Sequence, residues 1–497
     1  MTEDSPSARE AAEATAAGLA PLARWQPAGG WVVVEVVPIS AFLELSAAIA
    51  RRARSARETE EALDLLAADL LGAGDGPARR ALAARTTNSH LSHDLHYYKA
   101  KFFPRMARSL LNAMTAGNPD ARVVDNFTGS GTTLLEAATL GLESTGYDVD
   151  PLSVLISRAK VGLLSMDAGA LEATAHHAFR RLESPITPTA DRLEMPSWLS
   201  RNRRMTRELA ATISHEVAVI RAAVTDAPAE HRDLLNVLIS DAVSRRVRLR
   251  FLGTGVGRFS LTVAKTPMPV HFERSLRRCV TAAAVASWLR RRTGVHPARA
   301  EVVRGDARHV NRARGGFDAL LTSPPYLPAS SGRETYARAR ALPLLALGLA
   351  DPSELEELAD TAVGSMGTDA PVGELSPRER EAVEWLGADE LRAPKAAPTA
   401  RYFLDMRATF KAMTSLLNPG APAVVVSGKQ STFYEFASRR TAYVVPAAEL
   451  LAEEAERAGF AVEGLQDLEL AKSNMNARPR SLDPYYETLI LLRAPAP

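Results

Sequence analysis

The sequence predicts an α/β fold, in which a doubly wound, largely parallel sheet is interrupted by an inserted helical domain. Three observations favour this fold. Short apolar runs that read as strands alternate with helical patterns along much of the chain. The run "ARVVDNFTGSGTTLLEAATLGLESTGYDVDP" reads as strand, glycine-rich turn, helix and second strand, which is a βαβ unit. Residues 155–297 are mostly helical in pattern and separate this unit from the next expected strand.

The expected elements follow in order. Residues 29–39 read as a strand and residues 40–72 as one or two helices. After the βαβ unit and the helical block, strands are expected at 298–310, 317–326, 421–429 and 485–494, with a helix at 446–460. These patterns predict six parts: an N-terminal accessory region (1–85), a first core part (86–160), an inserted helical, basic domain (161–297), a second core part (298–345), an acidic insertion (346–400) and a C-terminal core part (401–497).

The composition is that of an ordinary globular protein, with 46% hydrophobic and 24% charged residues. No apolar run approaches the roughly 18 residues that suggest a membrane helix. The start, "MTEDSPSAREAAEATAAG", lacks the basic and apolar parts of a secretion signal, so a cytoplasmic protein is expected. The single cysteine, Cys279, excludes a disulfide framework and a multi-cysteine zinc site, and no metal is expected.

Charge is unevenly distributed, although the net charge is only +2. Residues 201–300 hold about 19 Lys and Arg against about 7 Asp and Glu, whereas residues 351–400 hold about 4 against about 12. The basic excess fits either solvated helix faces or a surface for a polyanion.

The glycine-rich turn is the first candidate site. The strand at Val123 and Val124 ends at Asp125, and the following glycines allow the backbone to pass close to a ligand. The threonines after them are expected to cap the next helix. The turn lacks the Gly-Lys-Ser/Thr of a phosphate-binding loop. The residues concerned are Asp125, Phe127, Gly129, Ser130, Gly131, Thr132 and Thr133.

Two further aspartates follow expected strands. Asp148 comes 17 residues after Gly131, near the spacing at which an acidic residue holds ribose hydroxyls in doubly wound folds. Asp306, in "VVRGDAR", could accept a hydrogen bond from an adenine amino group. Together these features predict a pocket for an adenosine-bearing ligand without a pyrophosphate, and S-adenosylmethionine fits better than NAD or ATP.

The tetrapeptide Ser323, Pro324, Pro325 and Tyr326 is the second candidate site, at the end of a strand. Two prolines stiffen the chain where it leaves the sheet. A fixed Ser323 hydroxyl and Pro324 carbonyl can accept the two N–H bonds of an exocyclic base amine and aim its lone pair at a methyl donor. Tyr326 can stack on the base, a contact worth about 1–3 kcal/mol. A base inside a duplex must first be flipped out.

This combination resembles the S-adenosylmethionine-dependent DNA amino-methyltransferases, which modify cytosine N4 or adenine N6. The resemblance is carried by "HYYKAKFFPRMA", "DNFTGSGTT", "GYDVDP", "GDAR", "TSPPY" and "ARPRSLDPYYETLILLR". It implies that Tyr98, Lys101 and Pro104 pack over the methionine end of the cofactor. It also implies that Asp148 holds the ribose and that the tetrapeptide holds the target amine. The serine form of the tetrapeptide favours cytosine N4 over adenine N6.

The sequence departs from this family in two ways. Asn126 stands where the family often has proline, and a long helical block follows the ribose aspartate. Because target-recognition segments are often insertions in this family, the block is expected to contact nucleic acid. The candidate nucleic-acid-binding residues are Arg245, Arg246, Arg248, Arg250, Arg333 and Tyr336.

DNA is the expected partner, with a nuclease or defence-system protein as a possible further one. Two alternatives stay open. One is the same chemistry on RNA or on an amide of a peptide or natural product. The other is a non-catalytic cofactor-binding or DNA-binding subunit.

Overall fold

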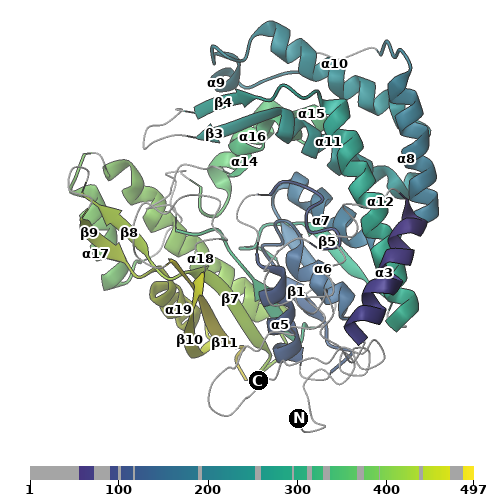
Figure 1. Ribbon diagram of the computed structural model, residues 1–497. Helices are drawn as coiled ribbons and strands as arrows, with labels where there is room; N and C mark the ends of the chain where they lie inside the picture. The colour runs from purple at the N-terminus through teal and green to yellow at the C-terminus, as the bar shows by residue number, and fades with distance from the viewer. Residues whose placement is uncertain are drawn as a thin grey trace.

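A mostly parallel seven-stranded sheet forms the centre of the molecule, in the order β10-β11-β7-β6-β1-β2-β5 (Figure 1). The coordinates are a computed structural model. They describe residues 55–71, 90–98, 102–115, 118–188, 193–251, 259–293, 296–310, 316–327, 336–365, 374–390, 392–435, 440–470 and 485–496.

The inner strand β1 (Val123–Asp125) is parallel to both of its neighbours, β2 (Ser144–Asp148) and β6 (Ala319–Thr322). Outside them, β5 (Ala300–Arg304) and β7 (Pro422–Gly428) continue the parallel order. The next strand, β11 (Tyr485–Arg493), is antiparallel to β7, and β10 (Ala461–Leu470) is antiparallel to β11. The sheet and the helices on both of its faces confirm the expected α/β class.

Alternation along the strands explains why both faces of the sheet are covered. Successive strand side chains point to opposite faces. Val124 packs with α18 (Ala396–Leu416) and α19 (Ala447–Arg457), whereas its neighbour Val123 packs with α5 (Pro104–Thr115) and α6 (Thr132–Thr139). Strands buried on both sides therefore appear in the sequence as continuous apolar runs.

The expected insertion lies between α7 (Pro151–Leu163) and β5, and it contains strands as well as helices. Its helices are α8 (Ala168–Glu183), α9 (Ser197–Ser200), α10 (Arg207–Ala223), α11 (Arg232–Arg246) and α12 (Met268–Thr293), with the short 3-10 turn η1 (Ala229–His231) before α11. The antiparallel hairpin β3 (Val247–Phe251) and β4 (Phe259–Val263) adds two strands to this domain, in which the sequence predicted helices only.

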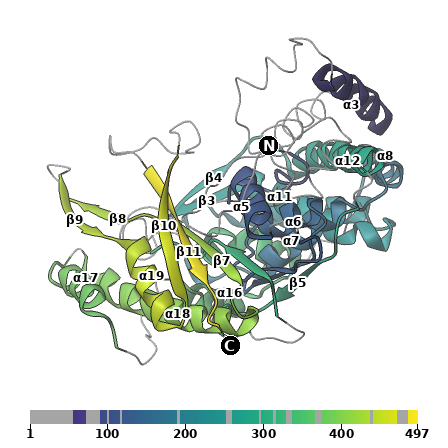
Figure 2. The same cartoon turned by 90° about the horizontal axis from the view of Figure 1, so that it is seen from below.

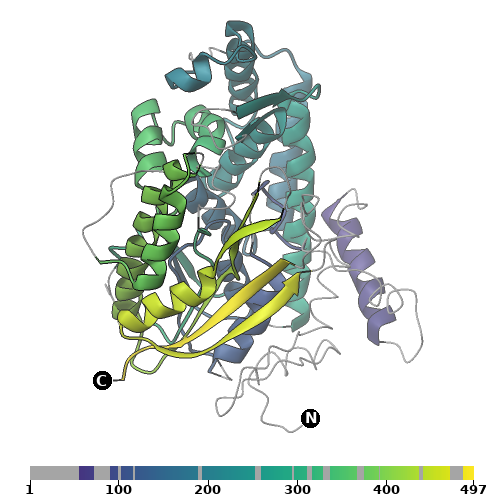
Figure 3. The same ribbon diagram turned by 90° about the vertical axis from the view of Figure 1, so that its left-hand side faces the viewer.

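The accessory region is described only in part. Helix α3 (Ala56–Leu71) lies along α12, as Figures 2 and 3 show, and Glu60 forms an ion pair of 2.8 Å with Arg291. The expected strand at 29–39 lies outside the described residues.

The part after β6 begins with α14 (Tyr336–Ala339), α15 (Ala341–Leu347) and α16 (Pro352–Thr361), of which α15 and α16 share a hydrophobic core with α11 and α12. It continues with α17 (Pro377–Gly387), the 3-10 turn η2 (Ala393–Lys395) and the hairpin β8 (Ser431–Tyr434) and β9 (Thr441–Val445). The expected boundaries at 160, 345 and 400 fall inside α7, α15 and α18. The division into domains stays a prediction.

Residues 90–98 are fixed by buried polar contacts on two sides. On one side, Glu136 on α6 accepts from His90 at 3.0 Å, from His93 at 2.6 Å and from Arg108 on α5 at 3.2 Å. On the other side, Asp241 on α11 accepts from the backbone N–H of Tyr97 at 3.0 Å. Burial, opposed by the bond to Glu136, lowers the pKa of His93 to about 3, so this histidine is neutral at pH 7.

No helix in the described part of the chain is both long enough and apolar enough to cross a bilayer.

We expect Glu136→Gln to lower the free energy of unfolding by about 3 kcal/mol, because it leaves Arg108 as a buried cation without its carboxylate. Urea unfolding checks this value. Glu143→Gln, at an exposed position just beyond the same helix, is the control and should lie close to wild type. An equal, small effect of both changes would contradict the role given to Glu136.

Candidate active site

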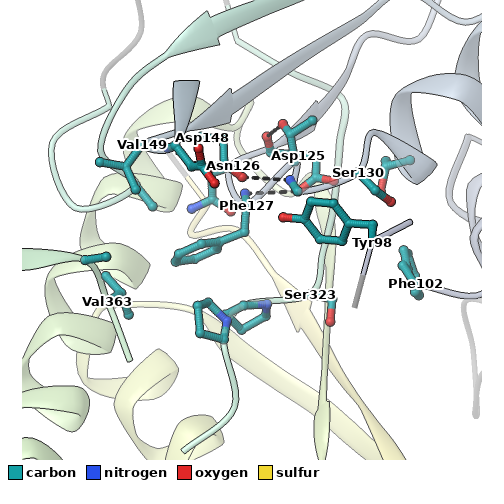
Figure 4. Close-up of a pocket in the computed structure, with 18 of the residues that line it drawn as sticks. Tyr98, Phe102, Asp125, Asn126, Phe127, Ser130, Asp148, Val149, Ser323 and Val363 are labelled. Atoms are coloured by element: carbon teal, nitrogen blue, oxygen red, sulfur yellow. Dashed lines mark hydrogen bonds between the residues drawn. The ribbon is translucent and has the colours of Figure 1, made fainter. Parts of the chain in front are cut away.

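A cavity of about 280 Å³ opens where β1, β2 and β6 end. Figure 4 shows the rings of Tyr98 and Phe127 on its walls, with Asp125, Asp148 and Ser323 nearby. The carboxyl ends of parallel strands are where doubly wound sheets bind ligands.

Both candidate sites of the sequence line this one cavity. The expected residues that line it are Tyr98, Asp125, Phe127, Gly129, Ser130, Thr132, Thr133, Asp148, Asp306, Ser323, Pro324, Pro325 and Tyr326. Two expected residues do not line it: Pro104 begins α5, and Gly131 packs against α7. Lys101 lies outside the described residues.

Asp125 links the two halves of the site. Its carboxylate accepts from the Thr322 hydroxyl at 2.6 Å, at the residue before the tetrapeptide, and from the Phe127 backbone N–H at 3.0 Å. Burial raises the pKa of Asp125 to about 6, and these hydrogen bonds oppose the rise. The end of β1 is therefore tied directly to the end of β6.

The glycines of the turn are required by backbone shape and by close approach. Gly129 and Gly131 have φ of 50° and 76°, in the left-handed region that favours glycine. A Cβ on Gly131 would lie 2.8 Å from Ser157 Oγ and 3.0 Å from Ser157 Cα on α7. Gly131 thus lets the turn run close against α7.

The threonines do not cap the helix as expected. Gly131 is the N-cap residue of α6, and no side chain caps it. Instead, the Thr133 hydroxyl donates to the Leu321 carbonyl on β6 at 3.3 Å. The left-handed turn starts the helix one residue earlier than the sequence suggested.

Asp148 faces the glycine turn. Its carboxylate accepts from the backbone N–H of Gly129 at 2.8 Å and of Asp150 at 2.9 Å. Burial and the nearby Asp150 raise its pKa to about 7, while the two backbone bonds and Arg340 oppose the rise.

Arg340, just before α15, is a partly buried cation that the sequence did not suggest for this site. It forms an ion pair of 2.8 Å with Asp150, donates to Ser153 Oγ at 3.0 Å and lies 4.9 Å from the centre of the Tyr98 ring. Burial raises the pKa of Tyr98 to about 12, so the phenol stays protonated at neutral pH. Arg340 therefore joins the segment after the tetrapeptide to the wall formed by β2 and Tyr98.

Asp306 lines the cavity with its carboxylate already paired. Arg308 donates to both carboxylate oxygens, at 3.0 Å and 2.6 Å. Burial opposes ionisation, but the bonds from Arg308 hold the pKa of Asp306 below its usual value. Its expected contact with an adenine amino group stays a prediction.

The tetrapeptide presents two acceptors and a fixed proline. Among the residues that the structure describes, neither Ser323 Oγ nor the Pro324 carbonyl has a hydrogen-bond partner. The Pro325 carbonyl, in contrast, accepts from the buried Tyr402 hydroxyl at 2.9 Å. Gly364, with φ of 77°, approaches so closely that a Cβ there would lie 2.8 Å from Pro325 Cβ.

The Tyr326 hydroxyl donates to Glu487 on β11 at 2.8 Å. Glu487 lines the cavity, and burial raises its pKa, an effect that the bond from Tyr326 opposes.

Sequence reasoning also missed Asn126, whose carboxamide is buried without a hydrogen-bond partner in the described part of the chain. Sequence analysis noted Asn126 only as a departure from the family pattern, because an unpaired amide depends on the folded surroundings and leaves no signal along the chain.

The candidate nucleic-acid-binding residues differ in the contacts and in the exposure of their side chains. Arg245 is paired with Asp241 at 2.6 Å, and Arg246 lies 3.4 Å from Glu216 and also donates to the Ala264 carbonyl. Arg248 is exposed on β3 and lies 5.7 Å from the centre of the ring of Tyr97, which is 52% exposed. The side chains of Arg250 and Tyr336 and all of Arg333 lie outside the description.

Comparison with known proteins gives two short similarities. The chain is 37% identical over 76 residues to the type II methyltransferase M.MvaI of Kocuria varians, which is 15% of this chain and 17% of that protein. It is 34% identical over 80 residues to the type II methyltransferase M.MjaII of Methanocaldococcus jannaschii, which is 16% of this chain and 14% of that protein. The similarity thus spans a small part of these relatives. No protein-family model matches the sequence.

Two of the solved structures that resemble this chain are distant matches. The rRNA methyltransferase aviRa of Streptomyces viridochromogenes has a TM-score of 0.31 at 12% identity, covering 82% of this chain and 97% of that chain. A SAM-dependent methyltransferase of Methanosarcina mazei has a TM-score of 0.27 at 9% identity, covering 76% and 94%. Scores this low support no conclusion about this chain.

We expect the free energy of unfolding of the ligand-free protein to depend on pH through the carboxyl group of Asp148. Between its ordinary pKa of 3.8 and about 7, the folded protein holds a proton that the unfolded chain releases, so stability falls as pH rises through this window. Asp148→Asn lacks this dependence. The variant's unfolding free energy minus that of wild type should therefore increase from pH 4 to pH 7, by at most about 1.4 kcal/mol per pH unit, and then level off.

Urea unfolding across this pH range measures the difference. Asp120→Asn, at an exposed aspartate, tests whether loss of any aspartate has the same effect. Parallel stability curves for wild type and Asp148→Asn would contradict the perturbed carboxylate.

Proposed function

We propose that this chain is an S-adenosylmethionine-dependent methyltransferase that modifies an exocyclic amine of a DNA base, with cytosine N4 favoured over adenine N6. The observation that carries the proposal is that the glycine turn with Asp148 and the tetrapeptide at Ser323 line one cavity. The short similarities to two type II methyltransferases support it.

The residues around Asp148 suit the adenosine part of S-adenosylmethionine. A ribose needs an acceptor for its hydroxyls, and the Asp148 carboxylate stands at the end of β2 on the cavity wall. Apolar groups such as Phe127 and Val149 flank it. Among described residues no lysine lines the cavity, which suits a nucleoside ligand without a pyrophosphate.

The tetrapeptide suits a planar amine as methyl acceptor. S-adenosylmethionine supplies an electrophilic methyl group, and an exocyclic amine is a weak nucleophile because its lone pair is delocalised into the base. Ser323 Oγ and the Pro324 carbonyl are two acceptors of the tetrapeptide without partners among the described residues, and two acceptors match the two N–H bonds of such an amine. The bond from Tyr402 to Pro325 holds these acceptors in place before the substrate arrives.

A nucleic-acid substrate is supported by the basic hairpin of the insertion. Arg248 on β3 is exposed and stacked with the exposed Tyr97, directly before the cavity residue Tyr98. An arginine with an adjacent aromatic ring can contact a phosphate and a base together. Arg245 and Arg246 stay candidates for phosphate contacts; in the ligand-free structure Arg245 pairs with Asp241, and Arg246 contacts Glu216 and the Ala264 carbonyl.

We expect N4-methylcytosine in DNA from cells that express wild type. Ser323→Ala, which removes one acceptor, should lower methylation about 100-fold, and Tyr326→Ala about 10- to 100-fold through loss of stacking. Nucleoside mass spectrometry measures both. Tyr434→Ala, a partly exposed tyrosine on β8 outside the cavity, is the control.

N6-methyladenine in place of N4-methylcytosine would keep the chemistry and overturn the choice of base. If wild type leaves DNA unmodified, the DNA proposal fails. RNA, peptide amides and a purely binding subunit are then tested with the same variants.

We expect Arg248→Glu to weaken duplex DNA binding and to reduce its dependence on salt, because one phosphate contact is lost. Fluorescence anisotropy at two salt concentrations measures both quantities. Arg299→Glu reverses an exposed charge before the amino end of β5, at the opposite edge of the sheet, and should change neither. Equal effects of the two changes would argue against a defined site on the hairpin.

A further inference from the structure

Glu487 stands beside the tetrapeptide although it lies 161 residues away from Tyr326 in the sequence. Its carboxylate accepts from the Tyr326 hydroxyl at 2.8 Å, and it is one of the cavity-lining residues. It lies within the C-terminal run that carries the family resemblance, but the sequence predicted no role for it.

The antiparallel direction of β11 explains this position. Parallel strands end at the edge of the sheet that holds the cavity, whereas an antiparallel strand begins there. Glu487 pairs with Gly428, the last residue of β7, so it stands at the same edge as the ends of β6 and β7. Its neighbour Thr488 is buried and donates to Asp467 on β10 at 2.6 Å, which holds this end of β11 in place.

Other contacts already hold the chain next to Tyr326. Pro325 is fixed by the hydroxyl of Tyr402 and by the close approach of Gly364. With the backbone held in this way, the main freedom left to Tyr326 is rotation of its side chain. The bond to Glu487 acts on that freedom, because it fixes the far end of the ring.

We infer that Glu487 is a positioning residue, which holds the Tyr326 ring in the orientation that stacks on the target base. The inference rests on the proposed function. A phenol that donates a hydrogen bond to a carboxylate also gains electron density in its ring. The ring face then attracts the positive charge that develops on the base during methyl transfer. Glu487 thus acts on the reaction through Tyr326 and need not touch the base itself.

The contact itself can be tested without any substrate. Protein labelled with ¹³C at the Cζ atom of tyrosine has 10 such signals, and the Tyr326 signal is the one that Tyr326→Phe removes. Glu487→Gln should shift that signal, because an amide oxygen is a weaker acceptor than a carboxylate. Glu463→Gln, which removes a carboxylate from the neighbouring strand β10, should leave it in place. An unshifted signal in Glu487→Gln overturns the inference whatever the protein methylates.

The role in the reaction is tested by single-turnover methylation of duplex DNA. Tyr326→Phe and Glu487→Gln should each slow methyl transfer about 10-fold, since each removes one charge-assisted hydrogen bond. The double variant should be no slower than either single variant, because both remove the same interaction. Binding of S-adenosylmethionine, measured by calorimetry, should stay at the wild-type value, which excludes general damage to the fold.

The outcomes separate the two proposals. Full transfer rate in Glu487→Gln, or strictly multiplicative losses in the double variant, overturns the positioning role while the methyltransferase proposal stands. A wild-type protein that methylates no nucleic acid overturns the proposed function, and the positioning role falls with it.

Discussion

The buried carboxylate of Glu136 is the contact on which much of the site depends. It lies on α6, one turn after the glycine turn, and binds three donors from residues 90–108. On the opposite side of the same segment, Asp241 binds the backbone of Tyr97. Tyr98 is therefore held between the sheet and the inserted helices, so that a Cβ on Gly129 would lie only 3.3 Å from its hydroxyl. The wall of the cavity that Tyr98 forms thus depends on the pairing of buried charges, because an unpaired buried charge would be strongly destabilising.

The parts of the site that the sequence predicts are those that local rules determine. Asp125, Asp148 and Ser323 each follow a strand, and parallel strands end at one edge of a sheet, so spacing along the chain was enough to bring them together. Arg340 and Glu487 could not be found in this way. Arg340 reaches the cavity from a helix boundary, and Glu487 reaches it because β11 is antiparallel; both positions depend on the packing of segments that are distant in sequence.

The strands of the fold divide in the same way, into those that the local sequence pattern predicts and those that depend on contacts between distant segments. Apolar runs buried on both faces, such as β7, were evident in the sequence. Strand β10 was missed because it lies at the edge of the sheet and has one exposed face, on which apolar Leu465 stands between the charged residues Glu463 and Asp467. The hairpin β3–β4 was missed because its basic residues, among them Arg248, stand between two long helical patterns. Short strands carry little pattern of their own, and their pairing is set by the partner strand.

The order of the strands has a consequence for how the protein is made. The backbone N–H of Arg122, the residue before β1, donates to the carboxylate of Asp318, which is 196 residues further along the chain. Strand β11 is inserted between β7 and β10 and is the last strand among the described residues. During synthesis on the ribosome, β1 therefore has no partner strand β6 until that strand has emerged. The site lacks one wall until residues 485–493 have emerged. Such non-local pairing makes folding slow and leaves apolar strand surface exposed during synthesis. A cell that makes this protein thus has a natural interval, set by translation, before any copy has a complete cavity.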